Sequence, residues 1–164
     1  MAEIYFEGRI SASKMRFISE LASFCADRLI PKNSHIMITF KAIRGFMAKD
    51  GFDGAISLED EDGEDSERHS DFLIEFDSGL SMRRLLSMIA HEMVHLKQYA
   101  LGELSESAID FAFYKWHNVY IDHRSLDYWD RPWEIEAYGR ELGLLTNWIA
   151  RAGYKNKYAW SRPD

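Results

Sequence analysis

The sequence predicts an α+β fold, in which a small mixed or antiparallel sheet packs against a helix over residues 81–101 and two further helices. Two observations predict it. Apolar residues recur at helical spacing in three segments, and β-branched or aromatic residues gather in short runs bounded by glycine, serine or aspartate. The chain has 164 residues, of which 46% are hydrophobic, so we expect one globular domain over residues 1–164.

The first elements are a strand, a helix and a second strand. "EIYFEG" alternates as a half-buried strand does, and Ser11 or Ser13 then caps a helix whose apolar positions recur every three or four residues. Pro31 ends this helix. Residues 35–43, "HIMITFKAI", predict a buried strand, and "GAISLED" predicts a shorter one.

The middle of the chain contains the longest helical pattern. Residues 71–77, "DFLIEFD", predict another strand, and the turn "SGLS" follows it. The helix predicted over residues 81–101 then has an apolar stripe at helical spacing. This stripe consists of Leu85, Ile89, Met93 and Leu96.

A hairpin and a final helix complete the predicted fold. "FAFYKWHNVYID" contains two β-rich runs around His117 and Asn118, which predicts a hairpin that turns at this pair. Pro132 is suited to the first turn of a helix, and Gly153 is suited to its end. The segment "WEIEAYGRELGLLTNWIARA" between them is therefore predicted to be helical.

Charge and composition argue against several classes of protein. The formal net charge of -7 makes the average surface repel phosphate, so we expect no general nucleic-acid binding. No stretch approaches the roughly 20 apolar residues that cross a bilayer, which argues against a membrane protein. The N-terminus carries acids where a secretory signal carries bases, so a cytoplasmic location is expected. The lone Cys25 predicts a small core residue without a disulfide.

The segment "SMIAHEMVHLKQYA" places two histidines and a glutamate in an apolar helical run. His91 and His95 are four residues apart, so both imidazoles lie on one face of a helix and can meet at one Zn²⁺ ion. Glu92 lies about a third of a turn around, where it can reach a water at the ion, and is predicted to be the general base. A structural role would leave three polar groups to be satisfied in an apolar segment. The pattern therefore favours a catalytic zinc site.

A catalytic zinc site needs a third protein ligand and an open position for water. Glu134 and Glu136 are the candidates, because both lie near the start of the last helix, where the helix dipole favours an anion. Two residues turn a helix by about 200°, so the two carboxylates point to different sides and only one can bind. The spacing alone leaves the choice between them open.

If a water at the zinc ion attacks a carbonyl group, the site also needs a donor for the negative oxygen that forms on that carbonyl. Tyr128, His123 and His117 lie between the two zinc-binding segments and are the possible donors. A peptide or protein substrate in extended form can pair with an exposed sheet edge. The strand over residues 71–77 is the candidate for that edge.

"HEMVH", followed about forty residues later by a glutamate on a second helix, resembles the gluzincin metallopeptidases, and the small size is similar to that of the minigluzincins. "YWDRPWEIEAYGRE" also resembles a segment of small bacterial and phage zinc peptidases. The likeness covers residues 71–142. It implies a zincin-like fold, in which the strand before the active-site helix borders the substrate cleft, and a zinc-dependent peptidase activity.

The resemblance also favours Glu134 over Glu136 as the third ligand. In gluzincins a small residue and a polar residue follow the ligand glutamate at the third and fourth positions, and Ala137 and Tyr138 occupy these places after Glu134. Many members have Asp or Asn at the second of them, where it holds a ligand histidine. Tyr138 departs from this pattern and is expected to support the histidine through its hydroxyl group.

Two other functions fit the same residues. One is a binding or structural module in which zinc joins the two helices without catalysis; the intact Glu92 argues against it. The other is an SprT-like, DNA-associated protease, because the C-terminal "RAGYKNKYAWSR" alternates basic and aromatic residues that could grip a single strand. The overall acidity and the absence of a zinc-finger cysteine set argue against this second alternative.

Overall fold

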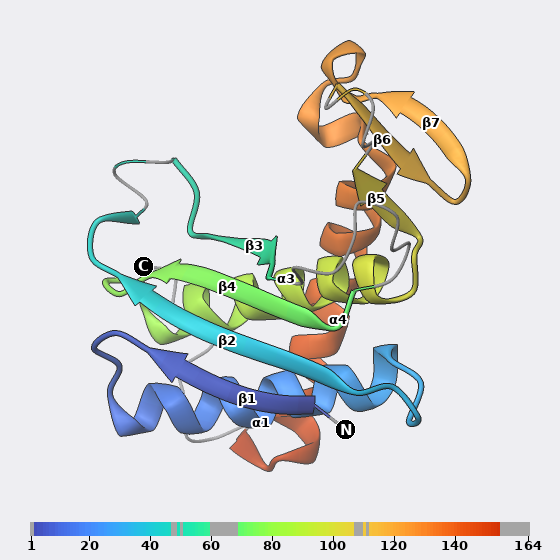
Figure 1. Cartoon of the computed structure of the whole chain (residues 1–164). Coiled ribbons are helices and arrows are strands. Elements are labelled where there is room, and N and C mark those ends of the chain that lie inside the picture. The colour runs from blue at the N-terminus through green and yellow to red at the C-terminus, as the bar shows by residue number, and fades with distance from the viewer. Residues whose placement is uncertain are drawn as a thin grey trace.

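The computed structural model of the chain describes residues 2–46, 49, 51–59, 69–106, 110 and 112–154. Within this part, three long helices and two small sheets form a mixed α+β fold, which confirms the predicted class (Figure 1). The helices are α1 (Ala12–Leu29), α3 (Met82–Ala100) and α4 (Pro132–Arg151). The strands are β1 (Ala2–Glu7), β2 (Ile36–Ile43), β3 (Gly54–Leu58), β4 (Asp71–Asp77), β5 (Leu104–Glu106), β6 (Phe113–Trp116) and β7 (Val119–Asp122).

The larger sheet is mixed and has the strand order β1-β2-β4-β3. β1, β2 and β4 run parallel to one another, whereas β3 pairs with β4 in the antiparallel direction. The prediction for residues 71–77 was right about the strand and wrong about its place, because β4 is paired on both sides. The edge strands of the described sheet are instead β1 and β3, and β3, the short strand "GAISL", is the edge beside β4.

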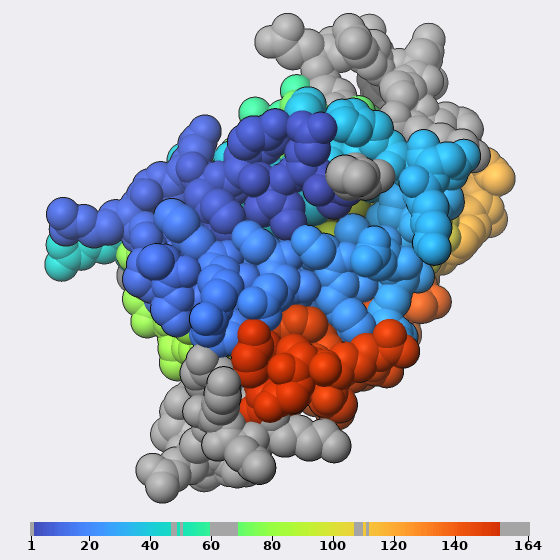
Figure 2. Space-filling view, turned by 90° about the horizontal axis from the view of Figure 1, so that it is seen from below, coloured from blue at the N-terminus to red at the C-terminus, as the bar shows by residue number. Residues whose placement is uncertain are grey.

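The helices cover one face of this sheet. In β2 the side chains of Ile36, Ile38 and Phe40 are buried, whereas the residues between them are partly exposed. Figure 1 shows α1 and α3 behind the strands, and Figure 2 shows α1 along the underside with the last turns of α4 beside it. The sheet and the helices thus form two layers with the core between them.

The core continues from the sheet through all three helices. Ser11 caps α1 by accepting a hydrogen bond from the backbone N–H of Lys14 at 3.2 Å. The buried face of α1 includes Cys25, whose thiol has a pKa raised to about 12 by burial. α4 contributes Trp148, which packs against Phe17 of α1 with ring centroids 6.2 Å apart. These contacts fix α4 against α1, and α3 packs against both helices.

The second sheet has the order β5-β6-β7 and lies beside the start of α4 (Figure 1). His117 and Asn118 form the predicted hairpin turn, with φ angles of 43° and 67°. Positive φ at both positions suits the twist of a two-residue hairpin, and asparagine tolerates it well. Two 3-10 turns, η1 (His123–Ser125) and η2 (Tyr128–Asp130), then lead into α4.

Some predictions lie wholly or partly outside the described residues. The basic and aromatic C-terminal segment that suggested a DNA-associated protease is among them, because its part beyond residue 154 lies outside the described residues. In the described part of the chain, no helix combines the length and apolar character needed to cross a membrane.

Candidate metal centre

α3 carries both histidines of the predicted site on its buried side. Ser81 caps this helix, and residues 85–98 are buried except for Ser87. His91 and His95 are 8% and 7% exposed, and their Nε2 atoms lie 3.0 Å apart. Two imidazoles that meet in a nearly dry interior need a shared partner, because burying unsatisfied polar groups is costly.

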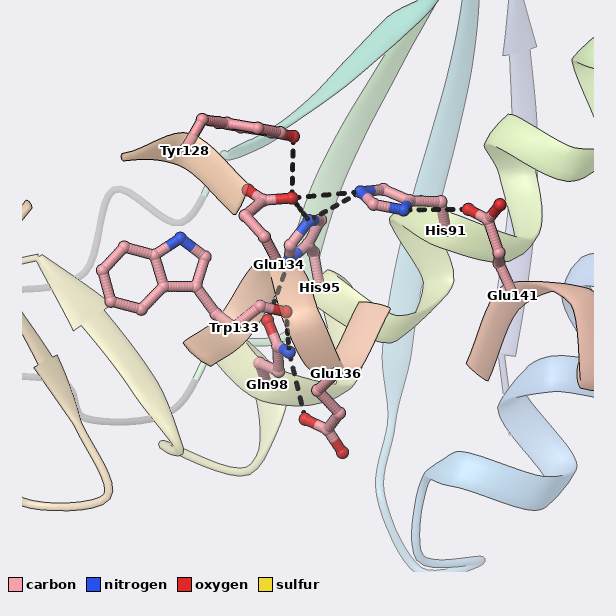
Figure 3. A network of polar contacts seen from close by, with 8 residues as sticks. All are labelled: His91, His95, Gln98, Tyr128, Trp133, Glu134, Glu136 and Glu141. Carbon is pink, nitrogen blue, oxygen red and sulfur yellow. Dashed lines mark hydrogen bonds and ion pairs between the residues drawn. The ribbon is translucent and has the colours of Figure 1, made fainter. Parts of the chain in front are cut away.

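The first turn of α4 brings a carboxylate to this pair (Figure 3). The Oε2 atom of Glu134 lies 3.4 Å from Nε2 of His91 and 3.4 Å from Nε2 of His95. Glu134 is itself buried. One ligand atom from each of these three residues lies within 4.8 Å of the others, so the group could hold a metal ion.

The geometry of the three atoms fits a tetrahedral ion. Ligand atoms about 2.05 Å from such an ion stand about 3.3 Å from one another. The separations of 3.0, 3.4 and 3.4 Å match this value without a movement of the backbone. Two imidazoles and one carboxylate leave the fourth position open, as a catalytic zinc site requires.

Glu136, the alternative third ligand, lies elsewhere. Its Oε1 atom accepts hydrogen bonds from Lys97 Nζ and Arg140 Nε, each at 2.8 Å. Its Oε2 atom accepts one from Gln98 at 3.0 Å. The structure therefore brings Glu134 to the histidines, whereas Glu136 belongs to an ion-pair network with Lys97 of α3 and Arg140 of α4.

Each histidine is held through the ring nitrogen that faces away from the centre. His91 Nδ1 lies 3.0 Å from Oε2 of Glu141, and His95 Nδ1 lies 2.8 Å from Oε1 of Gln98. Since carboxylate and amide oxygens only accept, the proton of each neutral imidazole lies on Nδ1, and both Nε2 atoms face the centre, where they can bind a metal after any proton there has left. These two supports set the tautomer that a metal site needs.

The support of His91 differs from the sequence-based expectation. Tyr138 was expected to hold a histidine through its hydroxyl group, but it packs its ring against that of His91, with centroids 4.4 Å apart. Glu141 makes the hydrogen bond instead. Its place seven residues after Glu134 puts both carboxylates on one face of α4, a spacing that could have indicated it.

Gln98 links His95 to α4. Besides supporting His95, its Nε2 atom donates to the backbone oxygen of Trp133 at 3.0 Å and to Glu136. Gln98 is fully buried, and its amide connects the last ligand of α3 to the first turn of α4. Glu136 therefore acts on the site indirectly, through the residue that orients His95.

The electrostatics of the centre favour a positive charge at its middle. Burial alone would lower the pKa of His91, but hydrogen bonds to Glu134 and Glu141 outweigh it and raise this pKa to about 9. Burial alone would raise the pKa of Glu134, but hydrogen bonds from both histidines and Tyr128 outweigh it and hold this pKa far below its usual range. In the metal-free protein a proton thus takes the place that a cation would occupy.

Glu92 has the environment expected of a base. It is 7% exposed, and burial raises the pKa of its carboxyl group. Within the described part of the chain no group donates a hydrogen bond to it. Its carboxylate is therefore left for water or substrate.

Two pockets meet at His91, Glu92 and Tyr128. We call the first the metal-centre pocket; it has a volume of about 230 Å³ and is also lined by His95, Glu134 and residues of β3 and β6. The second, the adjoining pocket, has a volume of about 380 Å³ and extends toward Arg84, Tyr138 and Glu141. Both touch Gly54 at the start of β3, so the sheet edge runs beside the candidate centre.

The three possible oxyanion donors lie in different places. Tyr128 lines both pockets and donates from its hydroxyl group to Glu134 Oε2 at 2.7 Å. The ring of His123 packs against Tyr114 with centroids 5.0 Å apart, and His117 forms the hairpin turn. Neither of these histidines is among the described residues that line the two pockets.

No protein-family model, no curated protein and no solved structure matches this chain. The findings on the site are therefore those of the structure itself: a mixed α+β fold that brings His91, His95 and Glu134 together in a buried group able to hold a metal ion.

Proposed function

We propose that the protein is a zinc-dependent metallopeptidase with a zincin-like fold, and that Glu92 is its general base. The observation that carries this proposal is the convergence of His91 Nε2, His95 Nε2 and Glu134 Oε2 at tetrahedral spacing. Beside them lies Glu92, which accepts no hydrogen bond from any other described residue. A purely structural zinc site commonly closes its coordination shell with four protein ligands. Here three ligands and an adjoining pocket favour catalysis.

Each residue has a defined part in the proposed reaction. A zinc ion held by His91, His95 and Glu134 would lower the pKa of water from about 15.7 toward 7 and would polarise a carbonyl oxygen. Glu92 takes a proton from the attacking water and passes it to the leaving amine, so it ends the cycle as it began. Its burial makes the carboxylate a stronger base than an exposed one.

Tyr128 is the best placed donor for the oxyanion. Tyr128 lines both pockets, and the hydrogen bond from its hydroxyl group to Glu134 holds that hydroxyl beside the three candidate ligands. A rotation of the hydroxyl proton is enough to redirect it toward a carbonyl oxygen. Loss of such a donor costs about 10² to 10³ in rate in other enzymes.

The strand β3 provides a place for an extended substrate. Within the described sheet β3 has a partner strand on one side only, and Gly54, Ala55 and Ile56 line the metal-centre pocket. A peptide that pairs with this edge makes backbone hydrogen bonds and passes the candidate centre. Backbone pairing requires little of the side chains, which suits a peptidase.

The proposal is tested by measuring bound zinc and peptide hydrolysis on the same samples. We expect one zinc per chain in the wild type, its loss in Glu134→Ala and its retention in Glu136→Ala, by elemental analysis after dialysis. Glu92→Gln is expected to keep the metal and to cleave labelled, denatured casein at least about 10²-fold more slowly.

Glu75→Gln is the matched control, because it makes the same change on β4, where Glu75 pairs with Lys41. It is expected to behave as the wild type in both measurements. Retention of zinc with no hydrolysis in the wild type would favour the structural module instead. Equal cleavage by Glu92→Gln would remove Glu92 from the role of base.

A further inference from the structure

Arg131 lies in the metal-centre pocket and forms no ion pair with an acidic residue in the part of the chain that the structure describes. It precedes α4 directly and lines the same pocket as His91, Glu92 and Glu134. Among the described residues that line this pocket, it is the only lysine or arginine. In a chain of net charge -7, an arginine inside a pocket that carries two carboxylates needs an explanation.

The contacts of Arg131 leave most of its hydrogen-bonding capacity unused. Its Nη2 atom donates to the backbone oxygen of His123 at 3.3 Å, and its guanidinium lies over the ring of Tyr128 at 5.5 Å from the centroid. Its buried Nε atom has no hydrogen-bond partner among the residues that the structure describes. A guanidinium has five N–H donors, so one long bond to a neutral oxygen satisfies little of it.

The surroundings hold the guanidinium in place without neutralising it. Stacking on Tyr128 fixes one face, and the bond to the segment of η1 fixes one end. Tyr114 and Trp133, stacked on each other with centroids 5.2 Å apart, line the same pocket and give it an apolar wall. A fixed, unpaired guanidinium beside aromatic rings suits a carboxylate attached to an apolar or peptide group.

From this arrangement we propose that Arg131 forms a carboxylate-binding subsite and directs cleavage to peptides that carry a carboxylate near the scissile bond. The inference rests on the proposed peptidase function, because it assigns a substrate class to the same pocket. The carboxylate has two sources, the C-terminus of a peptide and the side chain of an aspartate or glutamate. Both present the planar pair of oxygens that a guanidinium binds through two parallel hydrogen bonds.

Binding of matched peptides to the zinc-loaded protein tests the subsite separately from catalysis. One pair is acetyl-Ala-Ala-Phe with a free or an amidated C-terminus. The other is amidated acetyl-Ala-Glu-Ala and its Gln twin. Dissociation constants are measured by NMR titration in zinc-loaded Glu92→Gln, which slows hydrolysis. We expect the carboxylate member of at least one pair to bind about 10- to 100-fold more tightly than its twin. The pair with the preference identifies the source.

Replacing the arginine separates its contribution from that of the metal, which also attracts carboxylates. In the same background, Arg131→Gln is expected to bind both members of a pair equally, and Arg131→Lys to keep part of the preference, because it keeps the charge. Arg16→Gln, the same change in an exposed residue of α1, is the control and should leave the preference intact. The subsite proposal is overturned if zinc-loaded Glu92→Gln shows no preference for the carboxylate peptides. It is also overturned if the preference survives when Arg131→Gln is added.

Hydrolysis of the same peptides is then measured in the enzyme with Glu92 intact. It shows whether the subsite proposal or the peptidase proposal has failed. Cleavage of twin peptides at equal rates, unaffected by Arg131→Gln, would leave the peptidase proposal standing and remove the subsite. Carboxylate binding through Arg131 without hydrolysis of any peptide would leave the carboxylate-binding site standing and remove the peptidase proposal. A uniform loss of kcat in Arg131→Gln, with no change in the carboxylate preference, would make Arg131 an oxyanion donor and also overturn the subsite.

Discussion

Glu141 illustrates how a single residue outside the ligand set governs the candidate centre. Its carboxylate accepts the Nδ1 proton of His91 at 3.0 Å, which fixes the ring and makes Nε2 a better metal ligand. We therefore expect Glu141→Gln to lower zinc affinity by about 10- to 100-fold, measured at pH 9 in chelator-buffered zinc. Glu7→Gln, which removes one exposed carboxylate from β1, is the control and should bind as the wild type.

Protons compete with the metal at the same nitrogen atoms. The pKa of His91 in the metal-free protein is about 9, because its bonds to Glu134 and Glu141 outweigh the effect of burial. A proton must leave before zinc can bind, so the apparent zinc affinity should rise with pH up to about 9 instead of levelling off near 6.5. In Glu141→Gln one of these carboxylates is lost, and the rise should end at a lower pH. An affinity that is constant between pH 7 and 9 would contradict this account.

At the residue scale, the sequence was informative where chemistry is local. The spacing of His91, Glu92 and His95 requires only one helix, and the structure has that helix. The supports of the histidines could not be predicted with the same ease, because Glu141 and Gln98 meet them through the packing of α3 on α4. Arg131 was missed for a related reason: an arginine before a proline has no pattern of its own, and only the fold shows that none of the described acidic residues pairs with it.

Among the elements, β3 is the one whose position matters most for substrate. A Cβ atom on Gly54 would lie 2.7 Å from the backbone oxygen of Glu75 and 2.7 Å from Met88 Sδ. Because the first contact is with backbone, Gly54→Ala must push β3 away from β4. We expect a loss of roughly 1–3 kcal/mol in the free energy of unfolding and a lower rate of peptide cleavage, measured by urea denaturation and casein hydrolysis.

Gly143→Ala is the control for Gly54→Ala, because it makes the same substitution inside a helix. A Cβ atom there meets nothing within 4 Å, and the residue lies inside α4. Gly143→Ala should therefore stabilise the protein by about 0.5–1 kcal/mol through helix propensity and leave cleavage unchanged. If both glycine variants changed stability in the same direction, close packing at Gly54 would not be the cause.

The helices could be predicted from the sequence more readily than the short strands. α1, α3 and α4 were predictable because their apolar stripes and end signals, such as Ser11, Ser81 and Pro132, agree with each other. The three-residue strand β5 was not predicted, since so short a segment has no periodicity and is a strand only because β6 lies beside it. The edge position of β3 depends on strand order, which side-chain alternation does not encode.

At the scale of the whole molecule, the candidate centre is a junction between two parts of the fold. His91 and His95 belong to α3, which packs on α1 and α4, whereas Glu134 begins α4 beside the second sheet. An ion bound by all three residues connects these two parts of the fold, and the site that binds it forms only in the folded state. Metal binding should therefore contribute directly to the stability of the whole domain.

Zinc is accordingly expected to raise the melting temperature. Free zinc at 100 times its dissociation constant adds about 2.7 kcal/mol of stability, which for a domain of this size is a shift of about 5–10 °C. Calorimetry with zinc and after chelation measures it. Glu134→Ala lacks the ligand from α4, so its melting temperature should be nearly independent of zinc, whereas Glu136→Ala should keep the shift. An equal shift in Glu134→Ala would mean that zinc stabilises the protein at another site, and the junction between α3 and α4 would not be the metal centre.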